Sequence, residues 1–534
     1  MSVEETIQSP TIGNLSQDKT TPLANRTSIS GNRKWTFGQK FALRTATIFF
    51  TIMSIPWSVG WYKSLFAINW FSIHYRDLYD IARFQPSLYR FENPAYNLLG
   101  YGDWVQVFAI ALVGAGLWSV IEKRDSKLNY DALYYWVRVI ARYRAGIGII
   151  GFGFTKLFPT QMPYPGLGLL NTNFGDFTAQ KIYWLSVGIV PWYQVFAGIV
   201  EVLAGSLLFF RKTTTLGAAL LIGALGDITY VNFAYDGGVH VYASYFVLFA
   251  AFLLWYDAVP VYNLFIREKY TAPYTYQPSF KASWLRNSRL VLKVATIFIF
   301  LVYFTYAEVL NFKYDPYKQP AMSGVPKLRG NYHVSEFKIN GKEIPYSPLD
   351  SIRWRDVTFE KWSSLSYNVN RPTRLDLSNG GGSPMRDINR TFELTGTAGG
   401  KRVFYYDVDT LHHTLYLQDK YVDAIRRGKG KKKPKVDSGN DANWIPKDAK
   451  KDIQDEYSRI DPVALSNRRK KGIAEELKDK RKRNHMILNY QTTDGNHVIL
   501  NGIDEHRDSV YIVLDRFQKN YVLKDSKLEA GKYQ

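Results

Sequence analysis

Four ionisable residues lie inside long apolar stretches of this sequence. Glu201 falls near the middle of the stretch 195–212, and Asp227 falls at a similar depth in the next stretch along the chain. Arg144 and Lys156 lie in an earlier apolar stretch, separated by about 18 Å of helix rise. An unpaired charge among apolar helices costs several kcal/mol, so such residues need partners. We expect these four residues to form a buried charged site.

Arg144 is the expected partner of Glu201, because a guanidinium stays charged and can pair with a carboxylate through two hydrogen bonds. Such a pair can serve chemistry or ligand binding, which is the usual role of ionisable residues within membranes. It can also serve only to fix which helices pack together, with little net stability. Both interpretations stay open. Glycines that allow close helix approach recur beside these charges: Gly146, Gly148, Gly151, Gly153, Gly198 and Gly205.

A second polar group flanks the short turn 236–239. Its members are Tyr230, Asn232, Asp236 and His240. Residues of the long loop 62–103 could approach it, namely His74, Arg76 and Asp77. One interpretation is an outer polar mouth for a quinone head group or a small substrate, where a histidine accepts a proton. The alternative is a belt of interfacial side chains beside a loop.

Familiar catalytic patterns are absent from the sequence, so the catalytic residues, if any, stay unknown. There is no His-Glu-x-x-His motif, no Walker loop, no dinucleotide fingerprint and no serine nucleophile elbow. The absence of cysteine excludes disulfides and thiolate metal sites. His412 and His413 are adjacent, and we expect them on opposite faces of a strand, where they would not chelate one metal. No metal site is therefore predicted.

Seven apolar runs must position these residues. They cover approximately residues 41–61, 104–121, 137–158, 191–210, 216–234, 239–256 and 290–310. Each is close to the ~20 residues that cross a bilayer as a helix. We therefore predict a multi-pass α-helical membrane protein, with a transmembrane domain of residues 41–310. The loop between the first two runs contains an apolar pattern of helical spacing at 68–84, which predicts an interfacial helix.

Basic clusters follow every second run, which sets the expected orientation. Under the positive-inside rule, these clusters and the N-terminus lie in the cytoplasm. Residues 1–40 are rich in Ser, Thr, Asn and Gln, and we expect them to form a disordered cytoplasmic tail. An odd number of spans then exports everything after the last run. The predicted location is the inner membrane, with a periplasmic C-terminal domain.

The pattern changes after residue 311 to short segments that alternate apolar and polar residues. With turn residues between them, such segments predict an antiparallel β-barrel or sandwich over residues 314–534. A closed barrel of eight strands has an interior able to hold one small ligand. The segment 426–483 is rich in Lys and Arg, and it predicts a basic insertion. Because we expect this segment outside the cytoplasm, its predicted partner is solvent or lipid head groups and not nucleic acid.

The third to sixth helices resemble the DoxX family of bacterial membrane proteins. The resemblance rests on the Arg, spaced Gly and Lys of 144–158, and on 191–221, where a Pro opens the helix and glycines flank Glu201. It covers about residues 137–257, as a four-helix core. The resemblance implies that this core binds a lipid-soluble molecule, with a quinone as the expected cofactor, and that the protein serves redox or envelope homeostasis.

Two further resemblances concern the rest of the chain. The C-terminal domain resembles a lipocalin-like domain, although a lipocalin opens with Gly-x-Trp and this segment reads Gly330, Asn331 and Tyr332. The overall plan is similar to HTTM-type membrane domains, without an equivalent catalytic lysine. A rival hypothesis is a non-catalytic anchor or complex subunit, whose β domain binds an envelope protein or lipid. The expected partners are therefore the bilayer and other membrane proteins of the envelope.

Overall fold

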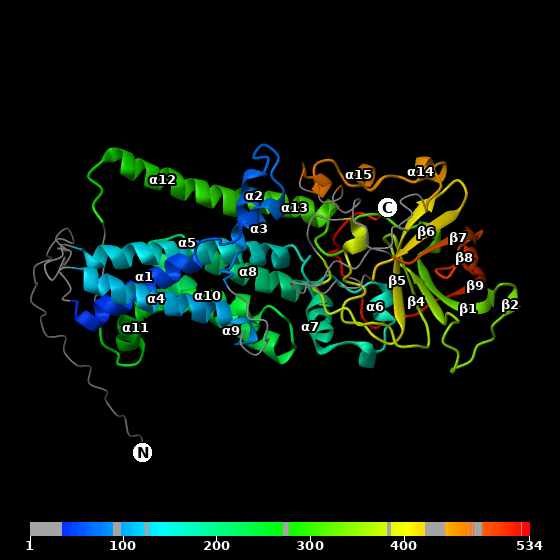
Figure 1. Cartoon of the computed structure of the whole chain (residues 1–534), viewed down its shortest axis with the longest axis horizontal. Helices are drawn as coiled ribbons and strands as arrows, with labels where there is room; N and C mark the ends of the chain where they lie inside the picture. The colour runs from blue at the N-terminus through cyan, green and yellow to red at the C-terminus, as the bar shows by residue number, and fades with distance from the viewer. Residues whose placement is uncertain are drawn as a thin grey trace, which may run out of the picture.

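The chain folds into a helical region followed by a β-barrel, and short helices lie between the two (Figure 1). The computed structural model describes residues 35–88, 98–122, 128–270, 276, 278–381, 386–421, 444–467, 469–471, 474, 483–524 and 526–533. Most of the predicted tail and much of the predicted basic insertion lie outside the described residues. The first helix begins at Phe37, within the tail predicted for residues 1–40.

Six helices form the packed bundle. They are α1 (Phe37–Met53), α4 (Gly102–Ile121), α5 (Tyr130–Leu157), α8 (Pro191–Leu208), α9 (Thr214–Ala234) and α10 (His240–Trp255). Sequence signals set several of their starts. A capping box between Thr36 and Gln39 opens α1, the Asn129 side chain caps α5, and Pro191 occupies the first turn of α8. Alanine, aliphatic and aromatic side chains together fill the bundle core.

The last helix before the barrel begins apart from the bundle and packs against it only in its second half (Figure 1). It consists of α12 (Ser283–Ile297), a π-helical segment (Phe298–Tyr303) and α13 (Phe304–Tyr314). No residue of α12 is buried, whereas α13 buries Phe304, Ala307, Glu308 and Asn311. The shorter helices of this region are α2 (Val59–Phe66), α3 (Tyr75–Ala82), α6 (Leu167–Leu170), α7 (Ala179–Gly188) and α11 (Ala258–Phe265).

Four helical segments among the described residues are long and apolar enough to cross a membrane. They are Gly102–Ile121, Pro191–Leu208, Arg211–Ala234 and Ser283–Tyr314. A fifth exists if α10 and α11, bent by 73°, count as one broken span. The other two predicted runs also form helices, but α1 has only 17 residues and α5 carries several charges. The helical class is therefore confirmed, while seven membrane spans stay a prediction.

The predicted interfacial helix at 68–84 is wrong in part. The helix that forms, α3, is shorter, and its residues Tyr75–Tyr79 are all buried. It packs against α5 and α13 through Tyr75, Leu78 and Tyr79. The apolar surface expected there is carried instead by α2 and the turn after it, where Phe66 is 83% and Phe71 is 103% exposed. The pattern indicated a helix correctly, but it could not show which neighbours cover that helix.

The C-terminal domain is a closed antiparallel barrel of eight strands with a short ninth strand attached. The strands are β1 (Gly330–Ile339), β2 (Lys342–Glu343), β3 (Asp356–Phe359), β4 (Ser364–Asn368), β5 (Lys401–Asp409), β6 (Thr414–Asp419), β7 (His485–Gln491), β8 (His497–Ile503) and β9 (Ser509–Phe517). Neighbours in sequence pair in order, and β1 also pairs with β9, which closes the barrel. Strand β2 is a hairpin extension of β1. The barrel form of the predicted fold is thus confirmed.

Successive side chains of a strand point to opposite faces of the sheet, so every second side chain points into the barrel. Leu365, Phe404, Leu417, Leu488 and Leu500 belong to this continuous apolar core and are fully buried. The described part of the basic insertion contains the short helices α14 (Ala449–Asp452) and α15 (Glu456–Arg459), and both lie along one side of the barrel (Figure 1).

Candidate functional site

The predicted buried charge pair exists, with a different partner. Lys156 at the end of α5 donates from Nζ to both carboxylate oxygens of Glu201 on α8, each at 2.8 Å. The two side chains are 9% and 1% exposed. The prediction that Arg144 pairs with Glu201 is therefore wrong. Spacing along the helix gave the depth of each cation but not the direction in which its side chain points.

Arg144 instead holds the chain that follows α3. Its guanidinium donates to the carbonyl of Ala82 at 3.0 Å and to the carbonyl of Phe84 at 2.6 Å. The guanidinium also lies 3.9 Å from the centre of the Phe84 ring. A charge that donates to carbonyls and faces an aromatic ring can be buried without a carboxylate partner. Arg144 therefore fixes a loop that is distant in sequence against the bundle.

Close approach of α5 and α8 brings Lys156 to Glu201. A methyl group on Gly146 would lie 2.9 Å from the carbonyl oxygen of Gly205, and one on Gly153 would lie 2.9 Å from the backbone nitrogen of Val202. A methyl group on Gly198 would collide with the backbone of Leu157. Four of the six glycines singled out in the sequence therefore permit this approach, whereas Gly148 and Gly151 face other side chains, including Phe246 and Phe304.

Asp227 does not join the pair. It is exposed on α9, whose buried residues include Leu221 and Leu225. Since successive residues turn by about 100° around a helix, Asp227 lies about 200° from Leu225 and faces away from the bundle. A similar depth in the sequence therefore did not mean a shared site.

The predicted outer polar mouth is dispersed over different surroundings. Tyr230 is 74% exposed, whereas Asn232 is buried and donates from Nδ2 to the carbonyl of Ile228 at 2.7 Å. Asp236 is exposed in the turn with a positive φ of 51°. His240 begins α10, where its Nε2 lies 2.8 Å from the carbonyl oxygen of Leu99 and its ring packs on Phe233. These contacts tie the turn to the neighbouring helices, and both interpretations of this polar group stay predictions.

His74, Arg76 and Asp77 lie together on another part of the helical region. His74 is the N-cap of α3: its Nδ1 accepts from the Arg76 amide at 3.3 Å, and Asp77 accepts from the His74 amide at 3.0 Å. Burial lowers the pKa of His74 to about 4, so its ring is neutral near pH 7. Arg76 pairs with Asp80 at 3.1 Å and lies over the Tyr79 ring. These contacts stiffen α3.

A cavity of about 330 Å³ lies between α2 and α3. Its apolar lining includes Trp57, Trp61 and Phe84, and its polar lining includes Asp80 and Arg83. The Trp61 indole Nε1 is buried and has no hydrogen-bond acceptor among the described residues. A concave, mostly apolar site with a few polar groups is the usual form of a small-molecule site. The sequence did not reveal this cavity, because its two walls meet only after α3 folds back onto the bundle.

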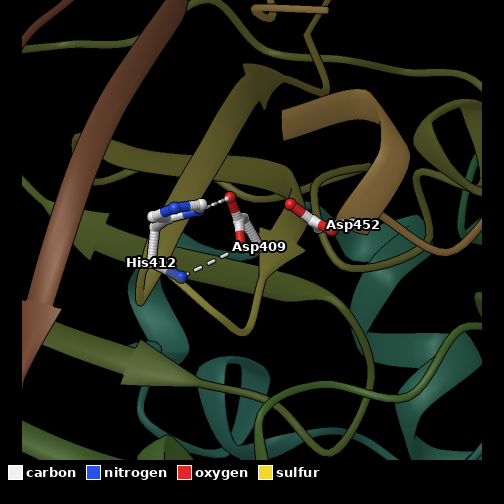
Figure 2. Close-up of side chains that lie close together, drawn as sticks. All are labelled: Asp409, His412 and Asp452. Atoms are coloured by element: carbon white, nitrogen blue, oxygen red, sulfur yellow. Dashed lines mark hydrogen bonds and ion pairs between the residues drawn. The ribbon is translucent and has the colours of Figure 1, made fainter. Parts of the chain in front are cut away.

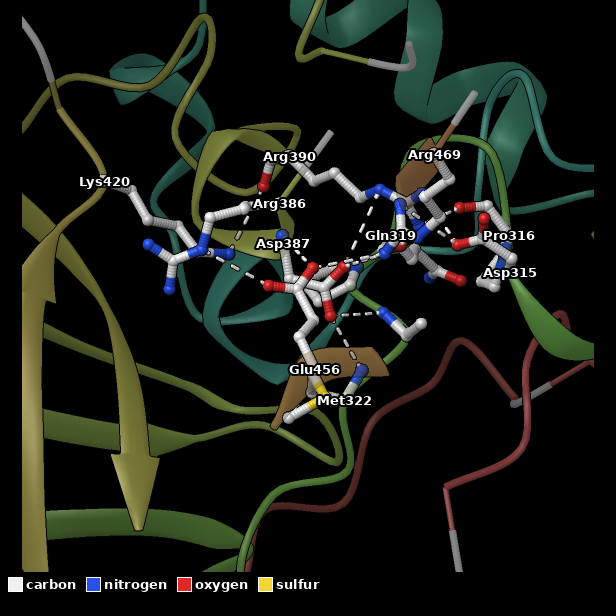
Figure 3. A network of polar contacts seen from close by, with 12 residues as sticks. Asp315, Pro316, Gln319, Met322, Arg386, Asp387, Arg390, Lys420, Glu456 and Arg469 are labelled. Atoms are coloured by element: carbon white, nitrogen blue, oxygen red, sulfur yellow. Dashed lines mark hydrogen bonds and ion pairs between the residues drawn. The ribbon is translucent and has the colours of Figure 1, made fainter. Parts of the chain in front are cut away.

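A buried ionic junction joins the helical region to the barrel (Figure 3). Asp315, at the end of α13, accepts from Arg390 at 2.7 Å and also lies 3.4 Å from Arg469. Arg469 further contacts Asp387 and Glu456, each at 3.2 Å. Burial, followed by the charge of Asp387, raises the pKa of Glu456 to about 7. Arg469, which belongs to the predicted basic insertion, therefore helps to fix the end of α13 to the barrel domain. The composition of the insertion did not indicate this structural role.

The short helices before α8 make a second attachment. The amides of Leu167 and Gly168 donate to the carboxylate of Glu360 at 3.1 and 2.8 Å. Lys401 donates from Nζ to the carbonyl of Gly168 at 2.6 Å. Burial lowers the pKa of Lys401 to about 8. Because Glu360 and Lys401 flank this turn from the barrel wall, the turn and the wall are tied by charge-assisted hydrogen bonds.

One group of side chains has the spacing of metal ligands (Figure 2). Ligand atoms of Asp409, His412 and Asp452 lie within 4.8 Å of one another. Asp409 already accepts from the amides of Leu411 and His412, each at 3.0 Å, and from His412 Nδ1 at 2.7 Å. A hydrogen-bonded turn accounts for the approach of Asp409 and His412, while Asp452 comes from α14, and we assign no metal to the group. His412 and His413 lie in this turn and not on a strand, contrary to the sequence-based expectation.

Comparison with known proteins gives one partial similarity. No protein-family model matches the chain, and no solved structure matches it. The chain is 30% identical over 87 residues to the uncharacterized protein YwoB of Bacillus subtilis (strain 168). The match covers 16% of this chain and 56% of that protein, so the chain spans little more than half the length of this relative. This similarity assigns neither a family nor an activity.

Proposed function

We propose that this chain is a multi-pass membrane protein that binds an amphipathic, lipid-soluble molecule in the cavity between α2 and α3. The observation that carries the proposal is the cavity itself. Its walls combine aromatic rings with a charged edge and one buried N–H donor that lacks an acceptor. A buried donor without an acceptor costs free energy, which a bound oxygen atom would recover.

The position of the cavity suits a ligand that arrives from a membrane. Helix α2 forms one wall and has no buried residue, and the turn that follows it exposes Trp70 and Phe71. Exposed aromatic residues of this kind are typical of the membrane–water interface. A ligand dissolved in the bilayer would therefore reach the cavity without crossing water.

The chemistry of the cavity favours a ring that carries carbonyl groups. The indole rings of Trp57 and Trp61 and the ring of Phe84 offer flat apolar surfaces, while the Trp61 N–H can donate to a carbonyl oxygen. The charged residues of the lining are Asp77, Asp80 and Arg83. A quinone has these features. The resemblance to the DoxX family implies the same ligand for the four-helix core of residues 137–257, which does not include the residues that line this cavity. Arg144 and the Lys156–Glu201 pair then act as positioning groups for the surrounding helices.

The proposed topology follows the basic clusters between the apolar helices. We place the N-terminus in the cytoplasm, the helices in the inner membrane and the barrel in the periplasm. A reporter that is active only in the periplasm, fused after Gln534, should be active. An inactive reporter with intact expression would reverse the orientation and make the basic insertion cytoplasmic.

The binding proposal is tested on the full chain purified in mild detergent. Organic extraction and mass spectrometry should find an isoprenoid quinone in stoichiometric amount. Trp61→Phe keeps an aromatic ring at this position but removes the indole N–H. It should lower the amount of retained quinone about fivefold to tenfold. Trp70→Phe is the matched control, because Trp70 is 51% exposed and does not line the cavity. Phospholipid alone in the wild-type extract would contradict the proposal.

A second candidate function is a membrane anchor for the barrel. The buried junction of Asp315, Arg390 and Arg469 favours it, because it fixes the barrel to the last helix as an anchor would. The two functions respond differently to change. A chain that works normally in cells with Trp61→Phe and with Glu201→Gln, but not after deletion of residues 314–534, would favour the anchor.

A further inference from the structure

The interior of the barrel is filled at one end and hollow at the other. At the filled end, the Phe359 ring packs between Tyr332 and Tyr406, with ring centres 5.9 and 6.3 Å apart. The Tyr332 hydroxyl lies 2.8 Å from the carbonyl oxygen of Leu328 and 2.9 Å from that of Gly495, within hydrogen-bond distance of both. At the other end, where β1 finishes and β9 begins, a cavity of about 360 Å³ remains.

Buried apolar side chains line this second cavity. Four come from strands, namely Phe337, Tyr367, Met486 and Val510, and two from the chain next to β3 and β4, namely Trp354 and Val369. Trp354 and Tyr367 stack with their ring centres 3.8 Å apart and their planes inclined by 10°. A space of this size is within the range of small-molecule sites, and its walls favour an apolar body.

Charged residues surround the opening, and their contacts decide which ligand head group fits. Three carboxylates are already engaged by donors. Asp504 accepts from the amides of His506 and Asp508, Asp508 accepts from Asn340, and Glu505 pairs with Arg402 through two hydrogen bonds of 2.8 Å.

The two remaining cations of the opening are Lys342 and Arg371. Both are exposed, and neither forms an ion pair with another of the residues that the structure describes. They lie beside the open end of an apolar cavity, so a negative group at the opening would gain charge-assisted hydrogen bonds.

We infer that the barrel mouth binds a small amphipathic carboxylate. Its apolar body lies among Trp354, Tyr367 and Met486, and its carboxylate faces Lys342 and Arg371. This site is separate from the cavity between α2 and α3: strand β2, which carries Lys342, lies at the end of the molecule opposite the helical region (Figure 1). The inference therefore does not depend on the proposed function of the helices.

The test uses the full chain in phosphatidylcholine nanodiscs and a decanoic acid that carries a diazirine. Irradiation should attach the probe to peptides that contain Trp354, Tyr367 or Met486, and peptide mass spectrometry locates the adducts. Labelling of helix α4 measures the probe dissolved in the bilayer and serves to normalise each sample. Unlabelled decanoate should compete at the barrel and not at α4.

Two comparisons make the inference falsifiable. The double variant Lys342→Gln with Arg371→Gln should lower normalised barrel labelling about tenfold, and the matched diazirine alcohol should label the wild-type barrel equally weakly. The double variant Lys524→Gln with Lys527→Gln removes the same charge from exposed residues away from the cavity and should label normally. Equal barrel labelling by acid and alcohol, or adducts confined to the helices, would overturn the inference.

Discussion

The Lys156–Glu201 pair makes a quantitative prediction about the helical region. Lys156 donates two hydrogen bonds to the Glu201 carboxylate, and water hardly reaches either side chain. Replacing one partner by methionine leaves an uncompensated buried group. Removal of one member of such a pair costs about 3–5 kcal/mol. We expect Lys156→Met and Glu201→Met each to lower the free energy of unfolding by that amount.

The double variant should behave differently from either single change. Two unbranched apolar side chains fill a similar volume and leave no buried charge, so most of the stability should return. The free energies are measured by titration with sodium dodecyl sulfate, followed through tryptophan fluorescence. The coupling energy of the double-mutant cycle should reach about 3 kcal/mol.

Two results would refute this reasoning. Single changes that each cost less than about 1 kcal/mol would mean that solvent reaches the pair. A double variant as unstable as the sum of the single changes would mean that the residues do not interact. The cycle also separates the two interpretations of the pair: a stable double variant that still retains ligand shows a packing role, and a stable one that loses ligand shows a functional role.

Three further predictions concern other contacts. Gly198→Ala should lower the free energy of unfolding by about 1–3 kcal/mol in the same detergent titration, because the new methyl group would collide with the α5 backbone. Arg144→Gln should speed amide hydrogen exchange in residues 75–88, since the guanidinium donates to two carbonyls there. The pKa of Glu456 is about 7 in the folded chain and 4.5 for an ordinary glutamate. Because the folded state holds this proton more tightly, the free energy of unfolding should fall as the pH rises from 4.5 to 7, by up to about 3 kcal/mol. Glu456→Gln should remove that dependence.

Each of these changes has a matched comparison. Gly223→Ala is the control for Gly198→Ala, because nothing lies within 4 Å of the added methyl group. Equal effects of the two alanines would contradict the close packing of α5 and α8. Unchanged exchange of residues 75–88 in Arg144→Gln would mean that Arg144 does not fix α3. For Glu456, the free energy of unfolding of the wild type and of Glu456→Gln is compared from pH 4.5 to 7. If the two stability curves run parallel over this range, Glu456 does not cause the pH dependence.

The classes of both regions could be predicted from the sequence, because they follow from local periodicity. Long apolar runs indicated the helices, and alternation indicated a barrel or sandwich. Barrel closure needed more, namely the pairing of β1 with β9, which no local pattern specifies. Among the described residues, fewer helices than predicted are long and apolar enough to span a membrane, because α1 is short, α10 is bent against α11 and α5 carries several charges.

The charged site could be predicted only as a set of residues. Glu201 and Lys156 were both recognised, but their pairing depends on the rotation of α5 against α8. Arg144 does not pair with Glu201, because its guanidinium donates hydrogen bonds to the backbone carbonyls of Ala82 and Phe84. The position of Asp227 along its apolar stretch suggested that it belongs to the buried charged site. It lies instead on the exposed face of α9, away from that site. The cavity beside Trp61 left no sequence signal, because two segments of the long loop form it together.

Closure of the barrel by β1 and β9 has a consequence for how the protein is made. Strand β1 is synthesised first, yet its partner β9 is the last strand of the sheet. Until β9 arrives, one edge of β1 presents unpaired backbone groups, which invite pairing with other chains. Arg469 of the insertion likewise reaches Asp315 only late in synthesis. Folding of this domain therefore leaves one sheet edge open until the last strand is made, and a chain truncated before β9 would be a substrate for aggregation or proteolysis.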